Sequence, residues 1–138
     1  MSHKKGFGKH ILLDLNDCNP EKLNDYNLCF NFLNELPDQI SMTKITQPYV
    51  FPYSGKVPED KGITGMVIIA ESHISIHTFP LKQYSFIDIF SCKPFNTELA
   101  IDLCIQTFES QDPKINICDR GEKFIRSAAT DKQFQVSK

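Results

Sequence analysis

The middle of the chain contains three short segments with strand-like patterns: the first is continuously apolar, and the second and third alternate between apolar and polar side chains. They span residues 65–70, 73–79 and 84–92. A period of two residues is typical of strands that bury one face. In the second segment Ile74 and Ile76 share one face, while His73, Ser75 and His77 share the other. The pattern predicts consecutive strands of one antiparallel sheet.

Helical patterns flank this group of strands on both sides. Asn19, Pro20 and Glu21 supply a cap, a proline in the first turn and an early acid, which predicts a helix over residues 20–36 that ends at Pro37. A second helix is predicted over residues 96–110, with Asn96 or Thr97 as its cap. Its apolar face comprises Ala100, Leu103, Cys104, Thr107 and Phe108.

The remaining strands are shorter. Residues 10–15 predict a first strand and residues 114–118 a last one. Residues 40–54 are ambiguous, because Ile40, Met42 and Ile45 favour a short strand while Pro48 and Pro52 interrupt regular structure. The resulting order is strand, helix, four strands, helix, strand. It predicts one α+β domain over residues 1–138, a two-layer sandwich with an antiparallel sheet and two helices on one face. A homodimer is one way to cover the other face.

Composition excludes several classes of protein. The net charge of −2 gives no general field for nucleic acid, and the five basic residues in 120–138 indicate a solvated tail. No apolar run is long enough to cross a bilayer, and no signal-type segment follows Met1. The five cysteines are odd in number and contain no CxxC pair. We therefore expect reduced thiols and a cytoplasmic protein.

Local patterns alone do not reveal chemistry. His73 and His77 are about 13 Å apart along a strand at ~3.3 Å per residue, too far to share a metal ion, so we expect no metal site. A catalytic group of Ser72, His77 and Asp88 lacks the G-x-S-x-G turn around its serine. Judged by spacing alone, the segment is an amphipathic strand and Cys92 is a packed thiol.

A longer motif changes this interpretation. The run Glu71-Ser72-His73-Ile74-Ser75-Ile76-His77-Thr78 is preceded by Gly62-Ile63-Thr64-Gly65 and followed by Ile87-Asp88-Ile89-Phe90-Ser91-Cys92. Together these segments resemble the prokaryotic S-adenosylmethionine decarboxylase proenzyme family, whose members depend on a pyruvoyl group. The resemblance extends from Gly8 to Gly121.

The resemblance implies roles for five residues. The chain would cut itself between Glu71 and Ser72, giving a β chain of residues 1–71 and an α chain of residues 72–138. Ser72 would become the pyruvoyl cofactor, whose ketone forms a Schiff base with the substrate. His77 would be the base that removes the Ser72 α-proton, and Thr64 would assist processing. Cys92 would return a proton to the substrate after carbon dioxide leaves.

The implied activity is decarboxylation of S-adenosylmethionine to the aminopropyl donor of spermidine and polyamine synthesis. The family usually has a glutamate for the ribose hydroxyls where this chain has Leu81. Gln83, Glu59 or Asp60 are candidate replacements. A pyruvoyl-dependent arginine or ornithine decarboxylase is therefore one alternative, and a catalytically silent activating partner is another.

Two further expectations concern substrate binding and assembly. The aromatic side chains of Phe51, Tyr53 and Phe79 either stack on the adenine or close the core. Ser72 and His77 are about 16 Å apart along one strand at ~3.3 Å per residue. We therefore expect a homodimer of αβ units with shared sites, in which His77 and Thr64 come from the neighbouring subunit.

Overall fold

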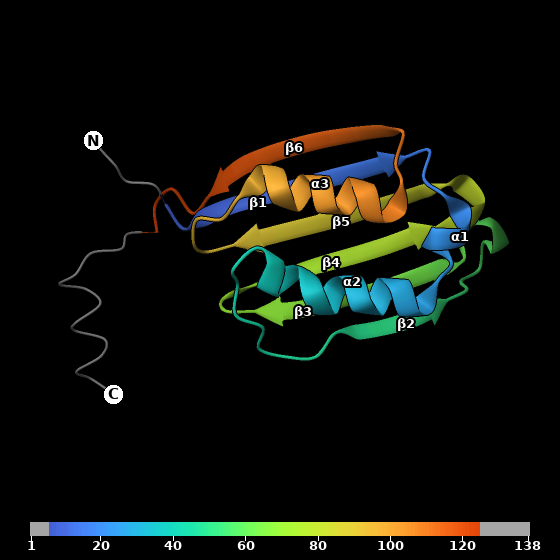
Figure 1. The fold of residues 1–138 in the computed structure, drawn as a ribbon, viewed down its shortest axis with the longest axis horizontal. Helices are drawn as coiled ribbons and strands as arrows, with labels where there is room; N and C mark the ends of the chain where they lie inside the picture. The colour runs from blue at the N-terminus through green and yellow to red at the C-terminus, as the bar shows by residue number, and fades with distance from the viewer. Residues whose placement is uncertain (1–5, 125–138) are drawn as a thin grey trace.

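The computed structural model describes residues 6–124. Residues 125–138, which make up most of the basic tail considered above, lie outside the described residues. Six strands form one sheet in the order β2-β3-β4-β5-β1-β6, and every neighbouring pair is antiparallel (Figure 1). The strands are β1 (Gly8–Asn16), β2 (Tyr49–Tyr53), β3 (Gly62–Ile69), β4 (Ser72–Phe79), β5 (Tyr84–Ser91) and β6 (Asp112–Arg120).

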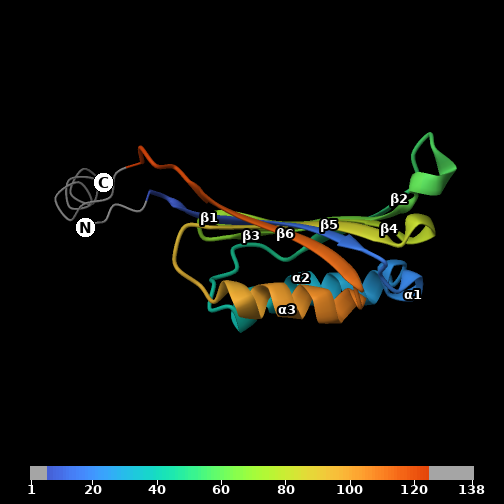
Figure 2. The same ribbon diagram turned by 90° about the horizontal axis from the view of Figure 1, so that it is seen from above.

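All of the α-helices in residues 6–124 pack on the same face of this sheet, as the edge-on view in Figure 2 shows. They are α1 (Pro20–Leu23), α2 (Tyr26–Gln39) and α3 (Thr97–Phe108). Asn96 caps α3, because its side-chain oxygen accepts a hydrogen bond from the Leu99 amide. The prediction of a two-layer α+β sandwich with helices on one face is confirmed. None of the helices within residues 6–124 is long and apolar enough to span a membrane.

The prediction of one helix over residues 20–36 was wrong at both the middle and the end. Asn24 interrupts it, and Asp25 begins α2 by accepting a hydrogen bond from the Leu28 amide. The helix also continues through Pro37 to Gln39. Pro37 cannot donate to the carbonyl four residues earlier, but its own carbonyl accepts hydrogen bonds from the Ile40 and Met42 amides, which close the end of the helix.

The second strand is also displaced from its expected position. Residues 40–45 contribute only an isolated bridge between Lys44 and Ile69, whereas Tyr49–Tyr53 forms β2 despite Pro52. Among residues 6–124, β2 is an edge strand that pairs only with β3. Proline is compatible with such a position because one side of an edge strand needs no hydrogen-bond donor.

The core lies between the sheet and the helices. Alternate residues of β1, β3, β4 and β5 are buried there against α2 and α3. Cys104 belongs to this core, as the helical pattern predicted, and Cys29 of α2 belongs to it as well. Phe108 is fully buried and packs edge-on against Phe32.

The other face of the sheet, which we call the open face, has no covering layer within residues 6–124 (Figure 2). It carries exposed large apolar side chains on three strands. These are Tyr49, Phe51, Tyr53, Met66, Ile68 and Phe86. The polar residues His73, Ser75 and His77 of β4 lie on this same face, as their alternation with Ile74 and Ile76 predicted.

Candidate active site

The expected cleavage position lies where a tight hairpin enters β4. Ile69 pairs with Ser72, so Ala70 and Glu71 alone connect β3 to β4. Glu71 is exposed, whereas the Ser72 side chain is buried on the helix side of the sheet. The peptide bond between these two residues therefore joins an exposed turn to a buried strand.

The Ser72 hydroxyl has an unusual environment. Its Oγ is buried and has no hydrogen-bond partner among the described residues. Most buried hydroxyl groups are paired, because an unpaired one costs about 1–3 kcal/mol. A hydroxyl that no neighbour holds is suited to attack the carbonyl group next to it.

Cys92 lies beside the same turn. Its Sγ is 3.5 Å from the Ala70 carbonyl oxygen and 3.5 Å from Oε1 of Glu71. Cys92 follows β5 directly, and β5 pairs with β4, so the sheet brings the thiol to the start of β4. Cys92 thus reaches Glu71 and the turn before Ser72 within one chain. We call Glu71, Ser72 and Cys92 the cleavage cluster.

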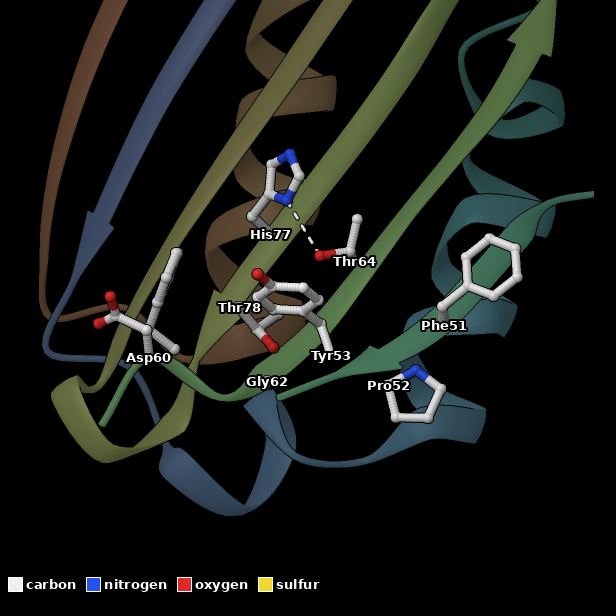
Figure 3. Close-up of a pocket in the computed structure, with 9 residues that line it drawn as sticks. Phe51, Pro52, Tyr53, Asp60, Gly62, Thr64, His77 and Thr78 are labelled. Atoms are coloured by element: carbon white, nitrogen blue, oxygen red, sulfur yellow. Dashed lines mark hydrogen bonds between the residues drawn. The ribbon is translucent and has the colours of Figure 1, made fainter. Parts of the chain in front are cut away.

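His77 and Thr64 form a second group toward the other end of β4. They are paired residues of β4 and β3, and Oγ1 of Thr64 lies 3.1 Å from Nδ1 of His77 (Figure 3). Both lie on the open face, where His77 is exposed. The Ser72 side chain points to the opposite face of β4, and five residues separate it from His77. The structure therefore brings Thr64 to His77 but does not bring this pair to the Ser72 of the same chain.

A cavity of about 540 Å³, here called the aromatic pocket, lies beside the Thr64–His77 pair (Figure 3). It is lined by Phe51, Pro52, Tyr53, Asp60, Gly62, Thr64, His77, Thr78 and Phe79. The exposed fractions of Phe51 and Tyr53 are 59% and 58%, so the interpretation that these two residues close the core is wrong. Gln83 lies outside this lining, and its amide donates to the Cys18 carbonyl oxygen at 3.3 Å.

A second cavity, of about 450 Å³, lies next to the cleavage cluster. Its lining includes Cys92 together with Phe7, Lys9, Lys93 and Phe95. Sequence reasoning singled out only Cys92 of this group. The adjacency of Lys93 to Cys92 was a local signal that could have identified it. No local sequence signal could have identified Phe7, because the pairing of β1 with β5 brings this residue to the cavity from a distant part of the chain.

Asp88 does not complete a catalytic group with Ser72 and His77. Its carboxylate contacts Nε2 of His10 at 3.2 Å and accepts a hydrogen bond from Ser75 at 3.5 Å. Burial, with a further contribution from His10, lowers the pKa of the neighbouring His73. No group of three or more potential metal ligands occurs within residues 6–124.

The cysteines differ in accessibility. Burial raises the pKa of Cys18 to about 11 and that of Cys29 to about 12, and it also raises the pKa of Cys104. These buried thiols stay protonated and unreactive near neutral pH. Cys92 is only partly buried and borders a cavity, so it is the cysteine placed to meet a ligand there.

An open-faced α+β sandwich with a serine and a cysteine at one hairpin is the arrangement expected of a self-processing decarboxylase. A sequence profile of the family described as "S-adenosylmethionine decarboxylase" matches residues 9–121. The chain belongs to the S-adenosylmethionine decarboxylase family.

Individual relatives agree with this assignment. The S-adenosylmethionine decarboxylase proenzyme of Thermodesulfovibrio yellowstonii is 34% identical over 117 residues, which cover 83% of this chain and 81% of the relative. The proenzyme of Archaeoglobus fulgidus is 31% identical over 115 residues, covering 83% and 97%. The crystal structure of the adenosylmethionine decarboxylase from Aquifex aeolicus superposes with a TM-score of 0.74 at 26% identity, covering 90% of this chain and 96% of that one.

Proposed function

We propose that this chain cuts itself between Glu71 and Ser72 and then decarboxylates S-adenosylmethionine, supplying aminopropyl groups for spermidine and other polyamines. Family membership supports the activity. The observation that carries the proposal is the unpaired Ser72 hydroxyl at the start of β4, with Cys92 beside the same turn. The five cysteines of the chain are all free, which is consistent with a reducing cytoplasm.

Processing begins with Oγ of Ser72 attacking the carbonyl carbon of Glu71. The C–N bond breaks, the nitrogen gains a proton, and an ester replaces the amide. Removal of the Ser72 α-proton then expels the Glu71 carboxylate and leaves a dehydroalanine at position 72. Hydrolysis of its enamine releases ammonia and leaves a pyruvoyl group at the start of an α chain of residues 72–138. The β chain comprises residues 1–71.

The cleavage cluster fits a pyruvoyl group at position 72. The unpaired Ser72 hydroxyl is the atom that the conversion consumes, and Cys92 borders an open cavity at this point. The pyruvoyl group supplies an electron sink for the pair left behind by departing carbon dioxide. Cys92 holds its thiol proton at Sγ and delivers it to the substrate carbon that has lost carbon dioxide.

We assign the base for processing to a second subunit. His77 and Thr64 lie on the open face, about 16 Å along β4 from Ser72 at ~3.3 Å per residue. A two-fold axis parallel to the sheet, above the middle of the open face, would stack two copies and bring this pair toward the exposed Glu71 turn of the second copy, from the side of β4 opposite to the Ser72 hydroxyl, and the reverse contact would follow by symmetry. The exposed apolar side chains of the open face give such a homodimer an interface to bury.

The aromatic pocket then holds the nucleoside. Phe51, Tyr53 and Phe79 offer flat apolar surfaces beside His77, and adenine stacks favourably on such rings. Gln83 is not part of this proposal, because its amide is bonded to Cys18 outside the pocket.

The decisive test is the denatured mass of the purified chain, before and after reductive trapping with S-adenosylmethionine and cyanoborohydride. The expected result is two fragments divided between Glu71 and Ser72, with an adduct on the fragment of residues 72–138. Two fragments that form an adduct only with arginine or ornithine would transfer the assignment to a basic amino acid decarboxylase. A single uncut mass under all conditions would favour a silent partner and contradict the proposal.

A further inference from the structure

The two edges of the sheet differ in how freely a further strand can pair with them. β2 forms one edge, and Pro52 lacks a hydrogen-bond donor near the middle of that strand. β6 forms the other edge, and its one proline, Pro113, lies close to its beginning (Figure 1). In the described part of the chain no strand lies outside β6. The stretch from Lys114 to Arg120 is therefore an uninterrupted edge of the kind that accepts another strand.

The position of Pro113 shows which backbone groups of β6 face outward. Pro113 has no N–H and yet pairs with Leu15 of β1, so its nitrogen lies on the side away from β1. Alternate residues of an antiparallel strand direct their amides and carbonyls to the same side. The backbone groups of Ile115, Ile117 and Asp119 therefore face outward as well, and no other strand of the described residues meets them.

The same part of β6 exposes apolar side chains beyond the helix layer. Ile115 and Ile117 pair with Leu13 and Ile11 of β1, so all four side chains lie on the helix side of the sheet. The two residues of β1 are buried, whereas Ile115 is 41% exposed and Ile117 is 46% exposed. The helices thus cover β1 but leave β6 largely uncovered. Apolar area and backbone groups are available together along this edge.

The sequence of β6 is complementary to itself when two copies run antiparallel with Asn116 facing Asn116. Ile115 of each copy then pairs with Ile117 of the other, and the outward backbone groups of these residues face each other. Asp112 of each copy lies opposite Arg120 of the other, and both residues are exposed. Unlike charges directly opposite in a sheet are stabilising.

The neighbouring registers lack this match. A pairing centred one residue earlier places Pro113 opposite Ile117, so the carbonyl of that isoleucine has no donor. A pairing centred one residue later places Lys114 opposite Arg120, and like charges directly opposite are destabilising. In the register centred on Asn116, the missing donor of Pro113 falls near the end of the paired stretch.

We propose that β6 pairs with β6 of a second copy of this chain, so that two sheets join edge to edge. The contact is two-fold, because both copies use the same residues. This inference rests on the homodimer of the proposed function. A single pair of edge strands is a small interface, so unstacked chains stay apart. Two stacked dimers join through two such pairs at once, which strengthens the association.

The stacked arrangement is compatible with this contact. When β4 of one copy lies along β4 of the other, the stacking axis runs across the strands and both β6 edges lie on the same side. Asn116 is in register with Leu12, Asp88 and Ser75, and Ser75 lies near the middle of β4. The centre of the edge pairing thus lies on the row of residues below the stacking axis. Two-fold axes that cross at right angles close an assembly at four chains.

Analytical ultracentrifugation of the purified full chain tests the assembly. We expect the native protein to sediment as a tetramer and Ile117→Pro to sediment as a dimer, a twofold fall in mass. The proline removes a donor from the outer side of β6 and none from the side that binds β1. Ile117→Val is the matched control and should remain a tetramer. An unchanged melting temperature shows that Ile117→Pro has folded.

Cysteine crosslinking tests the register. In the proposed pairing, residue 114 faces Cys118 of the second copy and residue 116 faces its own equivalent, at positions close enough for a disulfide. With diamide as the oxidant, Lys114→Cys should crosslink two chains, and adding Cys118→Ala should abolish the crosslink. Asn116→Cys combined with Cys118→Ala should crosslink. Stacked sheets lie about 10 Å apart, so the disulfide reports only the edge contact.

Denatured mass without reductant measures these crosslinks, and the outcomes separate this inference from the proposed function. A native dimer that remains a dimer in Ile117→Pro, or crosslinking that does not depend on Cys118 in the Lys114 variant, overturns the β6 contact and leaves the decarboxylase in place. A native dimer that Ile117→Pro converts to monomers would retain the β6 contact and overturn the stacking on which the shared sites depend.

Discussion

Oγ1 of Thr64 lies 3.1 Å from Nδ1 of His77, across a paired position of β3 and β4. This contact orients the imidazole, so that its other nitrogen is directed away from the threonine. The pair lies on the open face and not with the serine of its own chain. A histidine that is fixed by its own subunit but acts on another is consistent with sites that form only on assembly.

Exchange of subunits tests this arrangement. His77→Ala should slow processing by about 10²–10⁴-fold, the range for loss of a positioned general base. Thr64→Val should slow it by less than about tenfold, because a single hydrogen bond is lost. Coexpression of Ser72→Ala with His77→Ala should restore one cut chain per heterodimer, measured by denatured mass. Expression of His77→Ala alone is the control, and failure of the mixture to cut any chain would contradict shared sites.

Cys92→Ala should separate the two reactions. We expect cleavage to proceed, since the serine and the histidine do not depend on this thiol, while decarboxylation falls by about 10²–10⁴-fold. The measurement is carbon dioxide release from the cleaved variant. Cys118→Ala is the matched control, because that cysteine is exposed on β6 and lies outside the lining of both cavities. Equal activity in both variants would remove Cys92 from the mechanism.

A charge on the open face should prevent dimer formation. Phe86 is 41% exposed on that face, and Phe86→Asp would bury an unpaired carboxylate in the interface. We expect a monomer by analytical ultracentrifugation, together with loss of cleavage. Ile117→Asp is the control, since Ile117 is 46% exposed but pairs with Ile11 and therefore lies on the helix side. A monomeric control, or a dimeric Phe86 variant, would mean that the subunits associate by another surface.

Thr78 should contribute strongly to stability. Its Oγ1 accepts a hydrogen bond from the Ile63 amide at 2.9 Å and donates one to the Leu23 carbonyl at 2.8 Å. Thr78→Val leaves both backbone groups unpaired in a buried place, at a cost of about 1–3 kcal/mol each. Thr107→Val loses only a bond to a carbonyl of its own helix and should cost less than about 1 kcal/mol. Urea unfolding measures both, and similar midpoints would contradict this assignment.

His73 should make stability depend on pH. Its pKa is lower in the folded chain than the ordinary value of 6.5, mainly because of burial, although Asp88 opposes the shift and His10 and Arg120 support it. The unfolded chain therefore binds a proton more readily, and the free energy of unfolding falls as the pH drops below about 6.5 toward the folded pKa. His73→Gln should reduce the difference in melting temperature between pH 8 and pH 5.5. His77→Gln serves as the exposed control, and an unchanged difference in the His73 variant would exclude this cause.

Alternation predicted the central strands well, because one face of each is buried and the other is not. β4 and β5 begin and end within one residue of the predicted segments. Predictions from such patterns fail where a single residue, such as a helix cap or a proline, decides where an element begins or ends. Asp25 fits the polar face of one long helix but caps a new one. Pro52 argues against a strand unless the strand is known to lie at the edge of the sheet.

The site was predictable only where the motif is continuous in sequence. The family resemblance assigned Thr64 and His77 to processing and Cys92 to the substrate, and the structure brings Thr64 to His77 and Cys92 to Glu71. The direction of the Ser72 hydroxyl could not be predicted from the sequence, because it depends on the residue at which β4 begins. Phe7 and Asp60 reach their cavities through pairing between distant strands and through the packing of loops, which no local pattern encodes.

The order of strands has a consequence for the cut protein. The piece ending at Glu71 would contain β1, β2 and β3, and the piece starting at Ser72 would contain β4, β5 and β6. In the sheet β1 is inserted between β5 and β6, and β3 borders β4, so three of the five strand pairings join the two pieces. Self-cleavage would therefore yield an interlocked heterodimer whose halves cannot separate without unfolding. The uncut precursor is the only stage at which those halves are brought together by a covalent tether.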